Sequence, residues 1–430
     1  MSNPRGSNVI LNVNTLGFGQ RPAAWKFGGQ PKDAFLSSEY WQTLGRIAER
    51  GTLDAIFLAD SPQLEEDPKR RPTGNLEPTG VLTTIAAATE HLGLIGTATT
   101  TFNDPFELAE RFATLDFVSG GRAAWNVVTT YGSSAAKNFG LEENPPRDER
   151  YARADEFVSL VKSLWANRFE GVAHDGAAFS LHGGLRVPHS PQGSPLLVQA
   201  GGSPQGRALA AKHADVVFSA EMELGAGLEH YQLVKDDARA AGRDPDSIRI
   251  LPGLSVTLGS TEAEARERFD TWERGGPDGY GLGRFAGLLG PEVFELELDE
   301  RIPNALLERP PYEGFTGSLG FRESFIRFVQ SAELTVRELL RVDGGYGHRS
   351  IVGTPEQVAD AIEHWFLAGA ADGFNIMPGV LPLVLEDFVD GVIPLLRERG
   401  LFRTEYGAPT LRGRLLPHTL ETAHSSHSKE

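Results

Sequence analysis

Cysteine is absent from this chain of 430 residues, which excludes disulfide bonds, thiolate metal ligands and cysteine nucleophiles. Positive charge is scarce, because 41 lysines and arginines face 58 aspartates and glutamates and give a formal net charge of −17. That balance argues against a nucleic-acid partner, since phosphate binding needs a clustered basic surface. A short basic run from Lys69 to Arg71 is more typical of a solvated loop than of a binding patch.

Long apolar runs are also missing. No segment is apolar over enough residues to span a bilayer, and the N-terminus has no apolar signal region. We therefore expect a cytoplasmic protein with no membrane partner. Hydrophobic residues make up 40% of the chain and charged residues 23%, which is ordinary for a globular protein with a sizeable core.

Several catalytic motifs are absent as well. The chain has no Walker loop, and no GxGxxG sequence follows a candidate strand, so nucleotide hydrolysis and Rossmann-type dinucleotide binding lack their usual devices. The eleven histidines form no HExxH motif, and we expect no metal site. A GxSxG nucleophile elbow is missing too.

The segment 111–130 indicates the architecture. Phe112, Leu115 and Val118 continue one apolar helical face, a pair of glycines ends the helix, and an apolar strand follows. Similar units recur along the chain, with candidate strands at 9–13, 55–59, 93–100, 123–128, 196–199, 216–219, 248–256 and 374–377. Eight strands that alternate with helices predict an α/β fold of the TIM (β/α)8 barrel type.

Two segments do not fit this alternation. Residues 169–195 are glycine-rich and predict a hairpin-like excursion before the fifth strand. Residues from about 261 to 350 are too many for a normal connection and predict a long, mostly helical insertion after the seventh strand, with a proline-rich loop at 301–320. We expect a single barrel domain over 1–411 and a polar C-terminal tail over 412–430.

Polar side chains follow the second, third and fourth expected strands, at the end of the barrel where active sites lie. Asp60 comes directly after the second strand, where its carboxylate either binds a ligand or caps the following turn. Four threonines between Thr97 and Thr101, followed by Asn103, line the third strand's end, and Asn126 lies near the end of the fourth. Threonine is also a good strand former, so only the group as a whole favours a polar ligand.

The fifth strand leads into a helix with the features of an anion site. Ser203 is the expected N-cap, a proline takes the first helical position, and Gly202 allows close approach of a ligand to the backbone. Such a start aims free N–H groups and the positive end of the helix dipole at the barrel mouth, which favours phosphate over an ordinary capped helix. Arg147 and Tyr151 share one face of the preceding helix, and Tyr151 either reaches that phosphate or begins an apolar core.

Taken together, these motifs resemble those of the flavin-dependent monooxygenases of the bacterial luciferase-like superfamily. The resemblance is strongest to the branch that contains nitrilotriacetate monooxygenase component A, pristinamycin synthase and the dibenzothiophene-sulfone monooxygenases. The matching pieces are FLAD at 57–60, ATTTFNDP at 98–105, ERFATLD at 110–116, SGGRAAWNVVTT at 119–130, RYARADEFVSLVKSLW at 150–165, SPQGSPLLVQAGGSPQGR at 190–207, IVGTPEQVADAIEHWF at 351–366 and ADGFNI at 371–376. They cover most of the chain in the family's order.

The resemblance implies a two-component monooxygenase that binds reduced FMN supplied by a separate NAD(P)H:flavin reductase. In such enzymes O2 adds to the flavin at C4a, and the resulting C4a-(hydro)peroxyflavin oxygenates a small organic substrate. Many relatives carry a histidine where this chain has Arg147, which keeps a phosphate contact but not the role of a neutral imidazole. No residue stands out as a catalytic acid. The residues that the resemblance assigns to FMN are Asp60, Thr100, Thr101, Asn103, Asn126, Arg147, Tyr151, Gly202 and Ser203.

Two alternatives stay open from the sequence: a deazaflavin-dependent hydride-transfer enzyme of the same fold, and a flavin-binding protein without turnover. The WNVVTT and QAGGS segments fit the FMN branch better, and the complete polar rim from Asp60 to Ser203 speaks against a mere binding protein. The resemblance also implies a homo-oligomer. The insertion, with Phe315 and Phe321, is the expected pocket wall or lid. Sulfur compounds, amines, chelators and antibiotic precursors all remain possible substrates.

Overall fold

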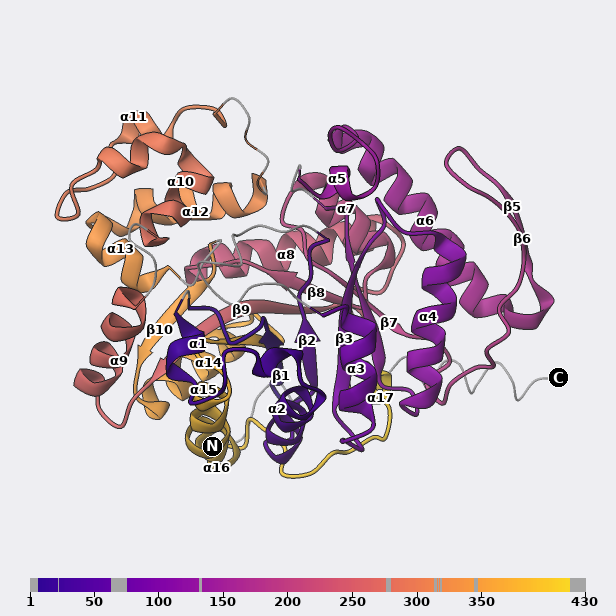
Figure 1. Cartoon of the computed structure of the whole chain (residues 1–430), viewed down its shortest axis with the longest axis horizontal. Helices are drawn as coiled ribbons and strands as arrows, with labels where there is room; N and C mark the ends of the chain where they lie inside the picture. The colour runs from indigo at the N-terminus through magenta and orange to yellow at the C-terminus, as the bar shows by residue number, and fades with distance from the viewer. Residues whose placement is uncertain are drawn as a thin grey trace.

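Eight parallel strands close into a barrel in this computed structural model, which describes residues 7–21, 23–62, 76–130, 134–275, 280–312, 315, 317, 319–343 and 347–417. The barrel strands are β1 (Ile10–Thr15), β2 (Ala55–Leu58), β3 (Gly93–Thr99), β4 (Ala123–Val128), β7 (Leu196–Gln199), β8 (Val216–Ser219), β9 (Arg249–Leu258) and β11 (Gly373–Pro378). Each strand pairs in parallel with the next, and β11 pairs with β1 to close the ring (Figure 1). The predicted barrel is therefore confirmed.

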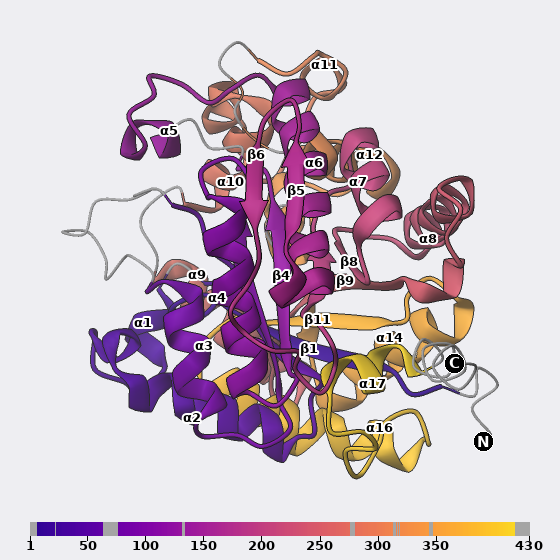
Figure 2. The ribbon, with the colours of Figure 1, turned by 90° about the vertical axis from the view of Figure 1, so that its right-hand side faces the viewer.

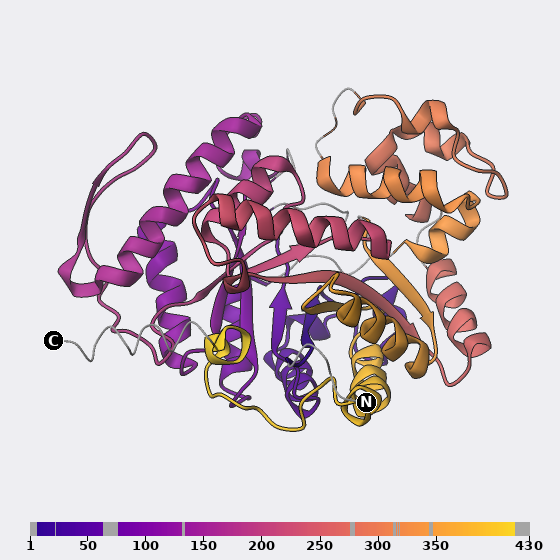
Figure 3. The ribbon, with the colours of Figure 1, turned by 180° about the vertical axis from the view of Figure 1, so that it is seen from behind.

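Helices surround the ring, as the three views show (Figure 1, Figure 2 and Figure 3). The longer ones are α2 (Ser38–Arg50), α3 (Pro78–Ala86), α4 (Pro105–Val118), α6 (Arg147–Asn167), α7 (Pro204–His213), α8 (Leu224–Ala240), α14 (Pro355–Ala368) and the consecutive α15 (Leu383–Asp387), η5 (Phe388–Val392) and α16 (Ile393–Glu398). Shorter ones are α1 (Ala24–Phe27), η1 (Ala34–Leu36), α5 (Ser134–Asn138), η2 (Arg168–Glu170) and η3 (Pro245–Ser247). Trp125 of β4 is buried against Phe157 and Trp165 of α6, which illustrates how the helices cover the strands.

Local sequence explains where α4 begins and ends. The Asp104 side chain accepts two backbone N–H groups of the first turn, at 2.8 and 3.1 Å, and so caps the helix. At the other end Gly121 adopts a φ of 85°, a conformation that costs other residues energy. Phe112 and Leu115 are buried as expected, but Val118 is 59% exposed, because the chain turns back toward the barrel only after it.

The two predicted excursions are present. Strands β5 (Val172–Asp175) and β6 (Ser180–Gly183) form an antiparallel hairpin that projects beside α6, most clearly in Figure 1. The insertion after β9 contains α9 (Glu262–Arg274), α10 (Tyr280–Leu289), η4 (Pro291–Glu295), α11 (Asn304–Leu307), α12 (Leu319–Ala332), α13 (Val336–Val342) and the strand β10 (Arg349–Gly353). Helices α10 and α12 share an apolar cluster in which the Phe285 and Phe325 rings lie 4.8 Å apart.

Two features of the insertion differ from the sequence-based expectations. The stretch 301–320 is not loop throughout, since α11 lies in it and buries Leu306 and Leu307; residues 313, 314, 316 and 318 lie outside the described part. The strand β10 was not expected. It pairs in parallel with β9 outside the ring, and its half-buried residues lack the continuous apolar character of the barrel strands.

The C-terminal segment fills the end of the barrel opposite its mouth. Leu411, Leu415 and Leu416 are at most 2% exposed and join an apolar cluster with inward-facing residues of the strands. The short helix α17 (Leu411–Leu415) supplies two of these leucines. The expectation of a polar tail from residue 412 is therefore wrong for its first residues, because the leucines between the arginines form a buried face. Residues 418–430 lie outside the described part.

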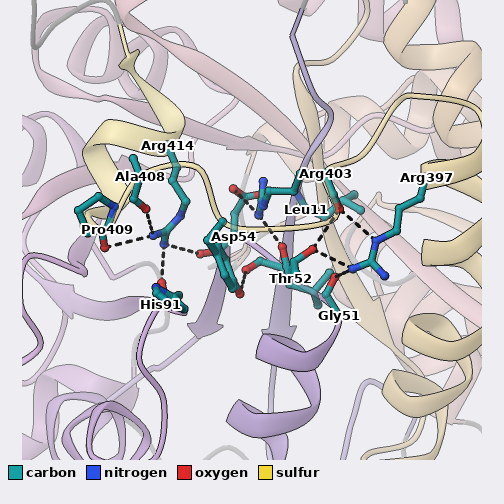
Figure 4. A network of polar contacts seen from close by, with 12 residues as sticks. Leu11, Gly51, Thr52, Asp54, His91, Arg397, Arg403, Ala408, Pro409 and Arg414 are labelled. Carbon is teal, nitrogen blue, oxygen red and sulfur yellow. Dashed lines mark hydrogen bonds and ion pairs between the residues drawn. The ribbon is translucent and has the colours of Figure 1, made fainter.

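A buried polar network ties the same segment to the barrel floor (Figure 4). Asp54 Oδ2 accepts the backbone N–H of Leu11 at 2.8 Å, and Oδ1 lies 2.9 Å from the guanidinium of Arg403. Arg414 donates to the carbonyl of His91 at 2.6 Å and to that of Asp54 at 3.4 Å. Burial lowers the pKa of Arg414 to about 10, so this guanidinium still carries its charge at neutral pH. Among the described residues, no helix combines the length and apolar character that crossing a membrane requires.

We expect Asp54→Asn to lower the free energy of unfolding by about 3 kcal/mol, because the variant removes the buried carboxylate that pairs with the half-buried Arg403 guanidinium. Chemical denaturation at pH 7 measures the loss. Asp390→Asn is the matched control, since it removes the exposed ion pair with Arg50, and we expect it to cost less than about 1 kcal/mol. Equal losses in the two variants would show that the network does not hold the barrel floor.

Candidate functional site

A cavity of about 620 Å³ opens at the end of the barrel where the strands' carboxyl ends meet. Its walls come from the loops after β2, β4 and β7, the last of which ends at the N-cap of α7, from the first turn of α6, and from the insertion. This is the end at which barrels of this kind carry their active sites. Five of the nine predicted binding residues line it: Asp60, Arg147, Tyr151, Gly202 and Ser203.

The start of α7 is built as the sequence predicts. Ser203 is the N-cap, its Oγ accepts the N–H of Gly206 at 3.2 Å, and Pro204 takes the first helical position. The hydroxyl of Tyr151 lies 3.5 Å from Ser203 Oγ. Since Gly202 and Ser203 line the cavity, the remaining N–H groups of the first turn and the positive end of the helix dipole favour an anion there.

Helix α6 brings a cation and a phenol to the same wall. Arg147 is its first residue, and within the described ranges no carboxylate forms an ion pair with it. Tyr151 packs its ring against the buried cluster between α4 and α6 while its hydroxyl reaches toward Ser203. The packing agrees with the interpretation of Tyr151 as a core residue, and its contact with a phosphate stays a prediction, which a tyrosine's apolar body and polar tip allow.

Arg150, which the sequence analysis did not select, also lines the cavity and holds its wall together. Its guanidinium donates to the carbonyls of Pro145 at 3.0 Å, Thr129 at 2.9 Å and Thr130. Thr130 has a φ of 42°, a left-handed conformation that is strained for a β-branched residue. Burial holds the pKa of Arg150 below its usual range. We infer that Arg150 fixes the strained end of β4 against the cavity.

Asp60 places a carboxyl group with a raised pKa at the cavity wall. Burial raises its pKa to about 6, the backbone N–H of Ser61 opposes this shift, and the negative charge of Glu77 adds to it. Asp60 lines the cavity while its carboxylate accepts the backbone N–H of Ser61, and its contact with a ligand stays a prediction. A carboxyl with a pKa near neutrality holds or releases a proton in the working range of most enzymes.

Four predicted binding residues lie off the cavity wall. Thr100 and Thr101 donate their hydroxyls to backbone carbonyls at the end of β4, at 3.3 and 2.8 Å. The amide of Asn103 donates to a β3 carbonyl at 2.8 Å. Asn126 is 3% exposed, and its amide donates to Thr97 Oγ1 at 2.9 Å. These side chains hold the rim in shape, and their contact with a ligand stays a prediction.

Gln199, the last residue of β7, is a second lining residue that the sequence analysis missed. It is 5% exposed, and its Oε1 has no hydrogen-bond partner in the described part of the chain. A buried amide oxygen without a donor is costly, so it marks a point at which a ligand N–H is expected. The signal was available, because a polar residue that ends an apolar strand was the reason for selecting Asn126.

The insertion supplies the apolar side of the cavity, with Phe315, Leu319 and Phe321. Behind Phe321 lies His348, whose ring is 5.6 Å from that of Phe321 and stacks on Phe218 of β8 at 5.0 Å. Complete burial lowers the pKa of His348 to about 4, so the imidazole is neutral at physiological pH. The expected role of Phe315 and Phe321 as pocket wall agrees with this placement. Within the described ranges, no group of three or more histidines and carboxylates is placed to hold a metal ion.

A parallel barrel with an anion-favouring helix start at its mouth and a helical insertion beside it defines an enzyme of the TIM-barrel class. The chain belongs to the luciferase-like monooxygenase family, which residues 24–372 match, and it is thus a monooxygenase. It is 39% identical to nitrilotriacetate monooxygenase component A of Aminobacter aminovorans, over 95% of this chain and 97% of the relative. It is 38% identical to dibenzothiophene-sulfone monooxygenase of Rhodococcus erythropolis, over 91% and 92%. A crystal structure of riboflavin lyase with modified FMN and riboflavin aligns with a TM-score of 0.81 at 28% identity, over 96% of each chain.

The raised pKa of Asp60 gives a pH-dependent stability. The folded state favours the protonated Asp60 carboxyl. The protonated carboxyl therefore costs the folded state nothing below pH 3.8, the ordinary pKa of an aspartate, and the folded state loses stability relative to the unfolded chain as the pH rises through about 6. We expect Asp60→Asn to match the wild-type stability near pH 4. At pH 7 the free energy of unfolding of the variant should exceed that of the wild type by up to about 3 kcal/mol, a value that solvent screening reduces. Denaturant titrations across this range measure the difference. Asp33→Asn is the control, because this carboxylate is exposed and makes no capping contact, and its stability should equal that of the wild type at both pH 4 and pH 7. A stability difference between Asp60→Asn and the wild type that does not change with pH would contradict the raised pKa of Asp60.

Proposed function

We propose that this chain is the oxygenase component of a two-component monooxygenase. It takes reduced FMN from a separate NAD(P)H:flavin reductase and uses O2 to oxygenate a small organic substrate. The observation that carries the proposal is the meeting of Arg147, Tyr151 and Ser203 at the start of α7. A guanidinium, two hydroxyls and free helix N–H groups on one cavity wall suit a phosphate. The modified FMN in the related riboflavin lyase structure supports a flavin as its carrier.

The remaining polar groups of the cavity fit the rest of such a cofactor. Gln199 Oε1 is buried without a donor, and an N–H of the flavin ring would satisfy it. Asp60 offers a second acceptor, or a donor when protonated. Ser203 Oγ already accepts one hydrogen bond from Gly206, so its own proton is free to be donated to a phosphate oxygen. We therefore assign Gln199 to FMN binding in addition to Asp60, Arg147, Tyr151, Gly202 and Ser203.

Reduced FMN, when bound, supplies the electrons and the activation of O2, which no side chain of this cavity provides. The chain's own residues bind the cofactor, orient it and keep water away. Phe315, Leu319 and Phe321 form the apolar wall that limits water at the reacting end. Asp60, with a pKa of about 6, is the group suited to hold a proton close to the ring.

Similarity to known relatives does not define the substrate class of this chain. Relatives of nearly equal identity are named for an aminopolycarboxylate and for an aromatic sulfone, so overall similarity does not choose between them. The apolar wall of the insertion is the surface on which we place the organic part of the substrate. Its residues lie far from the rim in sequence, which allows the substrate to vary while the cofactor site stays the same.

Turnover is tested by mixing the protein with FMN, NADH and a generic flavin reductase under labelled O2, with a panel of sulfides, sulfones, amines and aminopolycarboxylates. We expect a product that carries one labelled oxygen atom and that forms only when the reductase is present. Hydride transfer from a reduced deazaflavin without O2 would instead support the alternative oxidoreductase. Binding of reduced FMN with no product across the panel and no change in flavin oxidation would leave only a binding protein.

We expect Ser203→Asp to weaken the binding of reduced FMN by about 100-fold or more, because a carboxylate beside the phosphate repels it. Aspartate is also a good N-cap, so α7 stays intact and the loss reports on the ligand. Anaerobic titration of the variant with reduced FMN measures the dissociation constant. Thr261→Asp makes the same change at the N-cap of α9, outside the cavity, and should bind FMN as the wild type does. Unchanged affinity in Ser203→Asp would refute the phosphate assignment.

A further inference from the structure

A second, smaller cavity lies between the end of β8 and the helices α8 and α12, which are neighbours in Figure 1. Its volume is about 60 Å³, which leaves room for a few water-sized groups. Gly202 and Phe321 line both this cavity and the main one, so the two are adjacent. Ser324 of α12 donates its hydroxyl to the carbonyl of Ala220 at 2.7 Å and holds α12 over the small cavity.

Three buried polar side chains line this small cavity, and each has an atom without a partner. Ser219 ends β8, Glu221 follows it in the loop, and His230 belongs to α8. The three residues are 4%, 4% and 7% exposed. Ser219 Oγ, Glu221 Oε2 and His230 Nε2 have no hydrogen-bond partner in the described part of the chain. Three such atoms buried at one place cost free energy unless a ligand pairs them.

The carboxyl group of Glu221 has no buried cation beside it among the described residues. Its Oε1 lies 3.5 Å from His230 Nδ1. Burial, together with the positive charges of Arg207 and Arg327, lowers the pKa of His230 to about 4, so the imidazole is neutral at pH 7. Burial raises the pKa of Glu221 to about 8, although the charge of Arg327 opposes this shift. An ionised Glu221 therefore needs a positive charge from a ligand.

The outer edge of the small cavity does not supply that charge. Four charged residues line it: Arg207, Glu229, Glu323 and Arg327. Arg207 already pairs with Asp237 at 3.3 Å. Arg327 is exposed and faces two exposed glutamates, and the negative charge of Glu229 adds to the raised pKa of Glu221. The charges that line the cavity therefore favour a cation over an anion.

The three unpartnered atoms select the kind of cation. A hydroxyl oxygen, a carboxylate oxygen and the Nε2 of an imidazole whose Nδ1–H faces Glu221 all accept hydrogen bonds. A protonated primary amine offers one positive charge and three N–H donors, which match these acceptors. Ca²⁺ and Mg²⁺ prefer shells of about six or more oxygen atoms, and the described residues place no three histidines and carboxylates together for another metal.

We propose that Ser219, Glu221 and His230 form a binding site for a protonated primary amine. The bound ammonium group donates to all three side chains, and the proton that it displaces from the Glu221 carboxyl goes to the solvent. The amine is either a free small molecule or the amino group of a larger one that extends past Phe321 into the main cavity. The site uses neither flavin nor O2, so it goes beyond the proposed function and does not depend on it.

The test is an NMR titration of the full chain with isotopically labelled methylammonium at pH 9. We expect a dissociation constant of about 10 mM, near the limit for a ligand with two non-hydrogen atoms. At pH 7 the affinity should be about tenfold lower, because the Glu221 carboxyl must first release its proton. Tetramethylammonium has the same charge but no N–H donors and should not compete. Absence of methylammonium binding, or equal binding of the two cations, overturns the proposal.

Glu221→Gln keeps the shape of the side chain and removes its charge. We expect it to weaken methylammonium binding by about tenfold or more and to remove the pH dependence. The variant should fold, because burial already favours the neutral carboxyl. Glu267→Gln, at an exposed glutamate of α9 outside both cavities, is the matched control and should bind as the wild type does. Unchanged affinity in Glu221→Gln overturns the site. Binding by Arg327→Ala but not by the wild type would make the Arg327 guanidinium the occupant and also overturns it.

Hexylammonium distinguishes the two sources of the amine. Tighter binding than that of methylammonium, lost in Glu221→Gln and altered in Phe321→Ala, supports an amino group whose carbon chain extends into the main cavity. Affinity no greater than that of methylammonium supports a free small amine. Failure of the chain to bind reduced FMN would overturn the proposed function and leave these amine titrations unaffected, so the two failures are distinguishable.

Discussion

The pairing of β1 with β11 is the constraint on which the remaining structure depends. All eight barrel strands are parallel, so closing the ring places every carboxyl end, and every loop that follows one, around the same mouth. The backbones of β1 and β11 approach each other closely where the ring closes. A Cβ atom on Gly373 would lie 1.9 Å from the carbonyl oxygen of Ile10, so only glycine fits at this position. One layer further in, the amide of Asn12 donates to Asn375 at 3.1 Å and links the first and last strands through the barrel interior.

The two ends of the ring then carry different tasks. At the floor, the buried leucines of the C-terminal segment and the ion pair of Asp54 with Arg403 join the end of the chain to the strands, and the result is stability. At the mouth, several buried polar atoms stay without a partner in the described part of the chain, Gln199 Oε1 and Asn126 Oδ1 among them. Of these two, Gln199 lines the cavity, so a ligand bound there would complete the hydrogen bonding of its Oε1.

The sequence predicted the elements that depend on continuous apolar character. The expected strands at 123–128, 196–199 and 216–219 match β4, β7 and β8 to the residue. It failed where burial is decided by distant partners. The strand β10 is a half-buried neighbour of β9 inside the insertion, and α17 hides its leucines among arginines, so neither has a local signal. Ser203 could be predicted as a cap because capping depends on adjacent residues alone.

Three arginines of α6 show most clearly what the sequence alone does not predict about the site. Arg147, Arg150 and Arg153 follow one another at intervals of three residues in one helix, and the sequence selects Arg147 only for the face that it shares with Tyr151 and for the family resemblance. In the fold Arg150 is occupied by three backbone carbonyls, while Arg153 lies 4.3 Å over the ring of Phe179 and donates to the carbonyl of Thr100. Arg147 and Arg150 both line the cavity, but of the three only Arg147 makes no hydrogen bond or ion pair with another described residue. Residue type and spacing select the candidates for a site, but the hydrogen bonds made elsewhere in the fold decide which of them can still bind a ligand.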